Sequence, residues 1–289
     1  MIKLNIGASP IWRRHGWYIL DHKLKKNHNY FVSGNAENIN FKNNKCDTVF
    51  CSHVFEHIPH IRLPIVIAEI NRVMKKGAIL RILIPDLEKM CRAYVKKDNF
   101  FFKRAKSEDE SLRTDLGLGG MLMNTIVSAG QDTVLFDRNL KQFISGYAHL
   151  YSYDYKMLST ILKKLGFSVK KTKFCESKID EMKEPLHVIG MKPVWKDLNQ
   201  KFYKKNKLVH KLVKGRYKIN FKITGFDRNP LTSLIIEAKK IKDTSKKKAH
   251  KLFNLSTKSY NRYGYSLLSY KEFVKRLRNL KIDYKNHEK

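Results

Sequence analysis

The N-terminal sequence Lys3-Leu4-Asn5-Ile6-Gly7-Ala8-Ser9 constrains the fold more than any other stretch of the chain. It reads as an apolar strand that runs into a glycine turn, and a second strand, Trp17-Tyr18-Ile19-Leu20, follows shortly afterwards and ends in Asp21. Open α/β sheets build nucleoside pockets from such a turn and such a carboxylate. We therefore expect a nucleoside pocket here; the alternative is a plain structural turn.

The connection between these two strands is short. It holds Pro10 and the sequence Trp12-Arg13-Arg14-His15-Gly16, which leaves no room for a long helix. A dinucleotide site places its pyrophosphate at the N-terminus of such a helix, so the sequence argues against NAD. Asp21 remains placed to accept hydrogen bonds from both hydroxyl groups of a ribose, although a turn or cap role is the alternative.

Strands and helices then alternate along the chain. Tyr30–Ser33 reads as a third strand, and Cys46–Ser52 reads as a buried strand rich in β-formers. A helix with Pro64 in its first turn is expected to close at Lys75-Lys76-Gly77, and Ala78–Ile84 is an apolar strand. This alternation predicts an α/β fold with a doubly wound, mainly parallel sheet of about seven strands and an antiparallel last strand.

Polar and ionisable side chains follow the strand over residues 46–52. Ser52 and His53 come at its end, and Glu56 and His57 follow. Open α/β sheets hold their ligands at the carboxyl ends of strands, so these side chains are candidates for a site. The alternative is that Glu56 caps or pairs locally and that the histidines are structural.

The four cysteines offer no metal or disulfide framework. Their spacing, at Cys46, Cys51, Cys91 and Cys175, fits neither a zinc cluster nor a set of disulfides. We therefore expect no metal site and a reduced, cytoplasmic setting. The first strand begins at the N-terminus, so no secretory signal peptide is expected, and no apolar run approaches the roughly 18 residues that cross a bilayer.

A series of short motifs resembles the class I S-adenosylmethionine-dependent methyltransferases of the small-molecule, methyltransferase type 11-like family. That family runs from a glycine turn through an acidic end of strand two, an Asp-Ala step, a strand entering Glu-His, and a helix ending in Arg-Val-Leu-Lys-Pro-Gly-Gly. The order and spacing of the pieces carry the resemblance, over roughly residues 3–86. The pieces are Leu4-Asn5-Ile6-Gly7, Asp21, Asn35-Ala36-Glu37-Asn38-Ile39-Asn40-Phe41, Asp47-Thr48-Val49-Phe50, His53-Val54-Phe55-Glu56-His57-Ile58-Pro59 and Glu69-Ile70-Asn71-Arg72-Val73-Met74-Lys75-Lys76-Gly77.

The resemblance implies a Rossmann-like fold and S-adenosyl-L-methionine as the cofactor. It implies that the turn from Asn5 to Ser9, with Gly7 and Ala8 inside it, approaches the methionine part of this cofactor. By the same resemblance Asp21 binds the ribose. The turn has a single glycine where the family often has two or three.

The resemblance also assigns the adenine side of the pocket. Asn35 would face the adenine amino group with Ala36 beside it, and the backbone near Ser52 and His53 would line the donor pocket. Asn35 stands where the family usually has Asp, and its amide oxygen can still accept a hydrogen bond from adenine.

Catalysis asks little of the protein, because a sulfonium methyl donor carries its own electrophile. The protein has to align the acceptor, the methyl carbon and the sulfur, and at most supply a base. We expect His57 or His149 to be that base, with Glu56 and Tyr151 orienting it. His149 lies just before a predicted helix, in a stretch that reaches over the acceptor site in methyltransferases of this group.

The sequence divides into two parts near residue 195. Residues 1–195 are expected to form the methyltransferase domain, with 97–146 as a long irregular insert that is a candidate substrate lid; disorder is the alternative. A helix carrying Met157, Leu158, Ile161, Leu162 and Leu165 follows, and strands over Ser168–Phe174 and Leu186–Lys192 are expected to complete the sheet. Residues 196–289 would form a lysine-rich extension.

The C-terminal extension carries most of the positive charge. Residues 196–289 hold 27 Lys or Arg and 7 Asp or Glu, a net +20 of the +33 for the whole chain. Bases interleaved with aromatics can track a nucleic acid strand, and basic residues near an anionic membrane each contribute about 1 kcal/mol. Lys far exceeds Arg, however, which also fits an ordinary solvated surface.

Three function classes follow from these features. The first is a methyltransferase that acts on an oxygen or nitrogen of a small molecule, a glycan or a lipid-linked sugar. Such an enzyme would be cytoplasmic and peripheral at the inner membrane face. The second is an RNA or DNA methyltransferase that uses the basic extension as a substrate clamp; no Asn-Pro-Pro-Tyr type motif or catalytic Pro-Cys pair supports it. The third is a binding protein with this fold and no catalysis.

Overall fold

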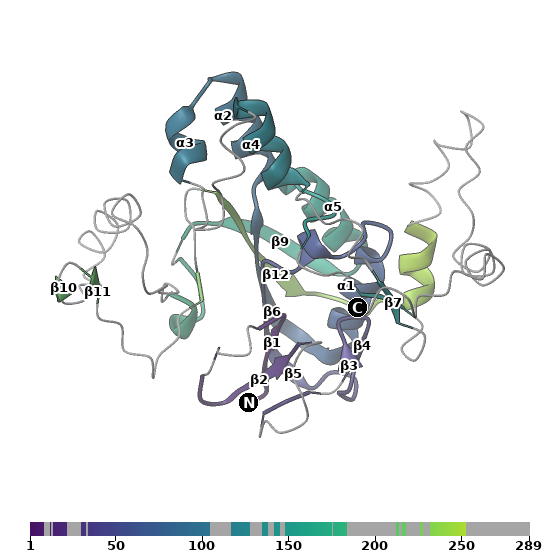
Figure 1. Cartoon of the computed structure of the whole chain (residues 1–289). Coiled ribbons are helices and arrows are strands. Elements are labelled where there is room, and N and C mark those ends of the chain that lie inside the picture. The colour runs from purple at the N-terminus through teal and green to yellow at the C-terminus, as the bar shows by residue number, and fades with distance from the viewer. Residues whose placement is uncertain are drawn as a thin grey trace, which may run out of the picture.

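The computed structural model describes residues 1–8, 12, 14–21, 30–32, 34–104, 117–127, 135–137, 142–144, 148–174, 176–183, 212–213, 216–217, 226–227 and 232–252. Within these residues a six-stranded sheet runs through the molecule in the order β2-β1-β5-β6-β12-β9 (Figure 1). Its strands are β1 (Lys3–Ile6), β2 (Trp17–Leu20), β5 (Cys46–Ser52), β6 (Met74–Pro85), β9 (Phe167–Thr172) and β12 (Ser233–Lys240).

The N-terminal part of this sheet is parallel. Strand β1 pairs in parallel with β2 on one side and with β5 on the other, and β5 pairs in parallel with β6. A parallel bridge between Ile19 and Phe31 lies where the sequence predicts the third strand. Central strands of parallel sheets are covered on both faces, and β5 is accordingly buried along most of its length. The predicted Rossmann-like, mainly parallel fold is confirmed.

The antiparallel strand comes from a part of the chain that the sequence assigns to the extension. Strand β12 pairs antiparallel with both β6 and β9 and so lies between them. The predicted strand over Leu186–Lys192 lies outside the described residues. Because β12 is an inner strand, the sheet extends well beyond the predicted boundary at residue 195.

Three helices have clear local causes. Helix α1 (Leu63–Val73) has Pro64 in its first turn, where the missing N–H costs nothing. Helices α2 (Leu87–Val95) and α5 (Tyr155–Lys164) begin after Asp86 and Asp154, whose carboxylates accept backbone N–H groups of the first turn. Helix α1 ends earlier than predicted, because Met74 is already extended and begins β6.

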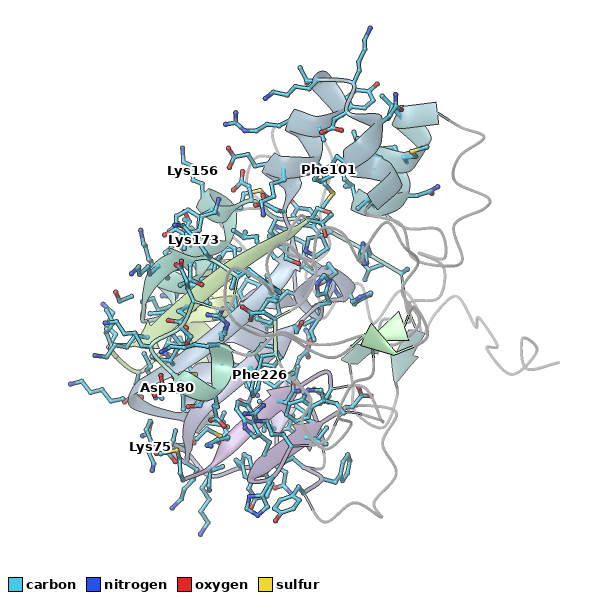
Figure 2. The ribbon with its side chains drawn as sticks, turned by 90° about the vertical axis from the view of Figure 1, so that its left-hand side faces the viewer. Lys75, Phe101, Lys156, Lys173, Asp180 and Phe226 are labelled. Atoms are coloured by element: carbon cyan, nitrogen blue, oxygen red, sulfur yellow. The ribbon has the colours of Figure 1, made fainter. Side chains whose placement is uncertain are left out.

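A helical cluster replaces part of the irregular insert predicted over 97–146. Helices α3 (Asn99–Arg104) and α4 (Gly117–Ile126) pack beside α2 at one end of the molecule (Figure 1). Met90, Phe101 and Phe102 are buried in this cluster, and Figure 2 shows Phe101 there, far from Phe226. The apolar side chains of the insert thus have a small core of their own.

The remaining described elements are short. They are β3 (Gly34–Asn35), β4 (Asn38–Ile39), the 3₁₀ helix η1 (Phe55–His57), β7 (Leu135–Asp137), β8 (Gln142–Ile144), the 3₁₀ helix η4 (Asp180–Lys183), β10 (Leu212–Val213) and β11 (Arg216–Tyr217). Among them, η1 and the β3–β4 hairpin contribute residues to the candidate site described below. No helix of the described residues is long and apolar enough to cross a membrane.

Aromatic packing attaches residues 226–227 to the N-terminal strands. The ring of Phe226 is fully buried, with its centroid 5.0 Å from that of Trp17 and 4.9 Å from that of Phe50. Beside it, Arg81 of β6 donates to Asp227 over 2.9 Å and to Glu237 of β12 over 2.8 Å. The guanidinium group of Arg81 therefore joins β6 to Asp227 and to the neighbouring strand β12, which both lie in the predicted extension.

Two lysines of residues 196–289, Lys240 and Lys246, donate hydrogen bonds to groups within the fold. Lys240 is buried, and its Nζ donates to Asn44 Oδ1, Asn71 O and Met74 O, each over 2.7 Å. Lys246 donates to a backbone carbonyl over 2.7 Å and pairs with a buried glutamate at 3.2 Å. Part of the positive charge of residues 196–289 is thus structural.

Candidate active site

Strand register brings three predicted donor-site residues to one edge of the sheet. Ile6 of β1 is aligned with Leu20 of β2 and with Cys51 of β5. The residues that follow them, Gly7, Asp21 and Ser52, therefore leave three adjacent parallel strands at the same level. Such carboxyl ends of strands are where open α/β sheets hold ligands.

The turn at Gly7 requires glycine for two separate reasons. Its φ of +71° lies in the left-handed region, and its N–H donates to Leu20 O over 2.7 Å. A Cβ atom at this position would lie 2.3 Å from Cγ2 of Val54. The turn after β1 and the loop after β5 thus touch, so both face the same space.

The rest of this turn differs from Gly7 in its exposure. Asn5 is almost fully buried within β1. The side chain of Ala8 packs in the aromatic cluster with Trp12 and Trp17, so the backbone of Ala8 is the part that can meet a ligand. Ser9 lies outside the described residues.

The predicted adenine-side residues lie in the β3–β4 hairpin. Oδ1 of Asn35 accepts a hydrogen bond from the backbone N–H of Glu37 over 2.8 Å, and Ala36 packs against the main core. Glu37 in turn forms an ion pair with Arg62, whose Nε donates to it over 2.8 Å. Since an amide oxygen can accept two hydrogen bonds, Asn35 keeps one acceptor position for a ligand.

The end of β5 combines an unsatisfied hydroxyl with a strained backbone. Ser52 Oγ is buried, and no described residue is its hydrogen-bond partner. His53 has a φ of +52°, which is uncommon for a residue with a side chain, and its N–H donates to Leu83 O over 2.8 Å. Strain of this kind concentrates at functional sites.

Glu56 is a buried carboxylate surrounded by imidazoles. Its side chain is 1% exposed, and Nδ1 of His53 lies 3.0 Å from its Oε1. Burial raises the pKa of Glu56, but the close approach of His53 and the nearby His57 and His149 outweigh it and lower the pKa to about 2. Glu56 is therefore ionised at neutral pH.

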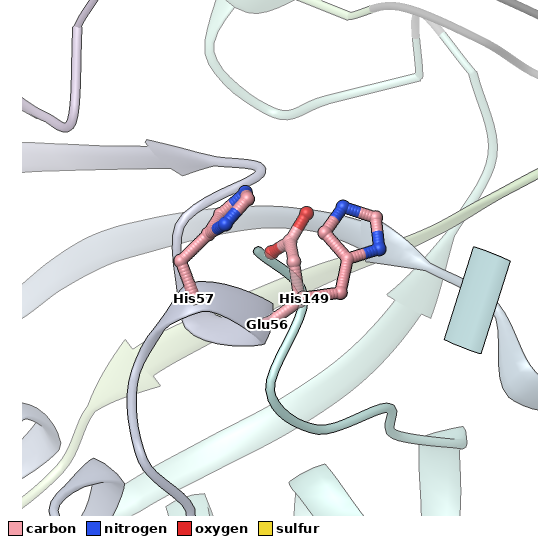
Figure 3. A group of neighbouring side chains, drawn as sticks. All are labelled: Glu56, His57 and His149. Carbon is pink, nitrogen blue, oxygen red and sulfur yellow. The ribbon is translucent and has the colours of Figure 1, made fainter. Parts of the chain in front are cut away.

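His57 and His149 meet next to Glu56 although they are far apart in the sequence. Their ring centroids are 4.9 Å apart, with the planes inclined by 72° (Figure 3). His57 Nδ1 lies 2.9 Å from Ala148 O, and His149 Nδ1 lies 2.8 Å from Thr125 O at the end of α4. The predicted catalytic histidines are thus brought together.

Backbone hydrogen bonds hold residues 148–151 against η1. The carbonyl of Glu56 accepts the N–H of Leu150 over 2.7 Å and that of Tyr151 over 3.3 Å. The ring of Tyr151 stacks on His60, with centroids 4.2 Å apart and planes inclined by 18°. Tyr151 is therefore at the edge of this cluster, with its ring against His60.

Sequence reasoning missed two members of this environment. The side chain of His53 pairs with Glu56, whereas the sequence suggested a role only for its backbone. His60 packs on Tyr151, and its pKa is lowered by burial. The available signal was that His53, Glu56 and His60 lie within eight residues of one another, directly after the buried strand.

A comparison with protein-family models finds one match within this chain. The model of the family described as a methyltransferase domain matches residues 18–82. This segment is therefore similar to a methyltransferase domain. The match runs from β2 through β5 and η1 into β6, so it includes Asp21, Glu56 and His57. The predicted resemblance is confirmed for this segment, and the cofactor of such a methyltransferase domain is S-adenosylmethionine.

Solved structures of methyltransferases also match this chain, at low identity. A SAM-dependent methyltransferase from Archaeoglobus fulgidus is 16% identical, with 83% of this chain and 86% of that chain covered and a TM-score of 0.36. The 1,6-didemethyltoxoflavin-N1-methyltransferase of Burkholderia thailandensis is 9% identical, with 83% and 71% covered and a TM-score of 0.39. The comparison with curated proteins gave no match.

Proposed function

We propose that this chain transfers the methyl group of S-adenosylmethionine to an oxygen or nitrogen atom of a small molecule, a glycan or a lipid-linked sugar. One observation carries the proposal. Gly7, Asp21 and Ser52 end three adjacent parallel strands at one level, and the loop that contacts Gly7 continues directly into Glu56 and His57. A donor pocket and a cluster of ionisable groups would then adjoin each other.

The donor site in this proposal uses both sides of the strand edge. The turn with Asn5, Gly7, Ala8 and Ser9 approaches the methionine part of the cofactor, and Asp21 accepts hydrogen bonds from the ribose. On the other side the cofactor meets four residues of the hairpin and the end of β5, which are Asn35, Ala36, Ser52 and His53.

The acceptor side of the proposal uses the histidine cluster. His57 or His149 takes the proton from the acceptor atom, because a neutral imidazole is a suitable base near neutral pH. Glu56 orients the ring through its charge, and Tyr151 lies beside the same cluster. Replacing His57 and His149 in turn tests this role, and full turnover in both variants would end it.

Calorimetric titration with S-adenosylmethionine tests the donor site. Asp21→Ala should weaken binding by roughly 1–3 kcal/mol, the cost of leaving hydrogen-bonding groups of the ribose unmatched. Asp47→Ala is the matched control, because Asp47 lies near the amino end of β5 at the opposite edge of the sheet, where it pairs with Lys75. No binding by the intact protein, or equal weakening in both variants, contradicts the proposal.

The acceptor class is tested by a panel of sugar nucleotides, lipids and RNA. The net charge of +20 over residues 196–289 favours RNA as the second candidate acceptor. Binding to RNA that weakens steeply with salt, together with methyl transfer to RNA, would favour the clamp role of that region. Binding to vesicles of anionic lipid and transfer to a lipid-linked sugar would favour the first class.

A further inference from the structure

Glu56, His57 and His149 form a compact set of possible metal ligands. One ligand atom of each residue can be chosen such that the three atoms lie within 4.8 Å of one another. Figure 3 shows the carboxylate of Glu56 between the two imidazole rings. Ligand atoms about 2.1 Å from a tetrahedral zinc ion lie roughly 3.5 Å apart, so small side-chain rotations bring this set to coordination distances.

Both imidazoles are held in the form that a metal ion requires. A backbone carbonyl can only accept a hydrogen bond, so Nδ1 of His57 carries a proton toward Ala148 O, and Nδ1 of His149 carries one toward Thr125 O. In a neutral ring the lone pair is then on Nε2. Histidine ligands of metals almost always donate their other ring N–H in this way.

The carboxylate supplies a second, independent observation. Glu56 is 1% exposed, and neither of its oxygens has a hydrogen-bond partner of good geometry among the described residues. Its nearest ionisable neighbour is His53, whose Nδ1 lies 3.0 Å from Oε1. A buried carboxylate is costly unless a cation or hydrogen bonds compensate it, and a bound metal ion does so.

We propose that Glu56, His57 and His149 bind one divalent first-row transition metal ion. Two imidazole nitrogens and one carboxylate oxygen suit zinc, iron or cobalt, whereas magnesium and calcium prefer oxygen ligands alone. Two histidines and a glutamate also leave further coordination positions for a substrate atom. The absence of a metal site was expected from the cysteine spacing alone. That spacing says nothing about this set, because His149 lies 92 residues after His57.

This inference deepens the proposed function and, for its catalytic part, rests on it. The metal ion would bind a hydroxyl oxygen of the acceptor and lower the pKa of that hydroxyl, taking over the role of a histidine base. The hydroxyl proton leaves to solvent, the oxygen forms a bond to the methyl carbon, and the carbon–sulfur bond breaks to release S-adenosylhomocysteine. An alcohol is then the favoured acceptor class.

Titration with cobalt tests the site without any reference to activity. Full-length protein without a polyhistidine tag is stripped with a chelator and titrated with Co²⁺ while its visible absorption is recorded. We expect one equivalent to bind with the spectrum of a site containing nitrogen ligands. Glu56→Gln, His57→Ala and His149→Ala should each weaken this binding at least about 10-fold.

Two histidine controls separate this site from general binding to a histidine-containing surface. His15 is exposed, and His60 stacks on Tyr151 rather than facing Glu56. His15→Ala and His60→Ala should bind one equivalent of Co²⁺ as the intact protein does. Equal weakening in these controls, or the absence of a stoichiometric site in the intact protein, overturns the proposal.

Thermal denaturation shows whether each variant is folded. A ligand that binds only the folded state raises the melting temperature, so Co²⁺ should raise it for the intact protein and for both controls. The three ligand variants should melt cooperatively without such a rise. If the protein binds one equivalent of Co²⁺ but no S-adenosylmethionine, the methyltransferase proposal is refuted and the metal site is supported. If the protein transfers methyl groups but binds no metal ion, only the metal site is refuted.

Discussion

Gly7→Ala tests whether the turn after β1 admits only glycine. The φ of +71° costs an alanine about 1–2 kcal/mol, because a Cβ atom in the left-handed region lies too close to the following carbonyl. The same Cβ would lie 2.3 Å from Cγ2 of Val54, and relieving such overpacking costs about 1–3 kcal/mol more. We therefore expect the free energy of unfolding in urea to fall by about 2–5 kcal/mol.

Gly16→Ala separates the two costs. Gly16 has a φ of +77°, and a Cβ there would meet nothing within 4 Å. This variant should lose only the backbone cost of about 1–2 kcal/mol. In a Val54→Ala background the loss caused by Gly7→Ala should fall toward the same value, because the clash is removed. Equal losses for Gly7→Ala and Gly16→Ala would refute the close contact between the turn and Val54.

Three further predictions concern residues that the fold buries. Asp227→Ala should lower the free energy of unfolding by about 3–5 kcal/mol, because it leaves the buried Arg81 without its bidentate partner. Asp180→Ala, which removes an exposed ion pair, should leave the free energy of unfolding nearly unchanged in the same denaturation assay. Lys240→Ala should cost about 3 kcal/mol by thermal denaturation, since three acceptors lose a charged donor, and an unchanged melting temperature would contradict this. Burial raises the pKa of Glu69, but hydrogen bonds from an arginine and a backbone N–H outweigh burial and lower the pKa overall. The contribution of Glu69 to the free energy of unfolding is therefore complete above about pH 4.3 and is lost as the pH falls through the lower pKa of the folded state. When the free energy of unfolding is measured against pH, its fall in acid should be shallower for Glu69→Gln.

Local sequence signals predicted the parallel half of the sheet. The apolar runs that became β1, β2 and β5 are bounded by Gly7, Asp21 and His53, and strand propensity is informative where such short runs are fully buried. The helix caps Asp86 and Asp154 are also local, because a carboxylate reaches N–H groups only two or three residues away. Element type could therefore be predicted here, although the boundary between α1 and β6 shifted.

The antiparallel edge could not be predicted in the same way. The apolar patch of residues 231–236 was visible, but it lies in a lysine-rich region, and composition suggested an extension. Lys240 shows why composition misled, since a buried lysine with three hydrogen-bond acceptors counts as surface charge in a sequence. Strand β12 pairs with β6 across about 150 residues, and no local pattern encodes such a pairing.

The sequence alone determined the residue types of the candidate site, and the tertiary structure decided which of them meet. Gly7, Asp21 and Glu56-His57 could be selected because each directly follows an apolar strand or lies in the next turn, a relation of a few residues along the chain. The distance between His57 and His149 depends on the hydrogen bonds that join residues 148–151 to η1, and chain connectivity places no limit on it. A close contact between distant segments is fixed by packing of the whole domain, so the Glu56-His57-His149 cluster appears only in three dimensions.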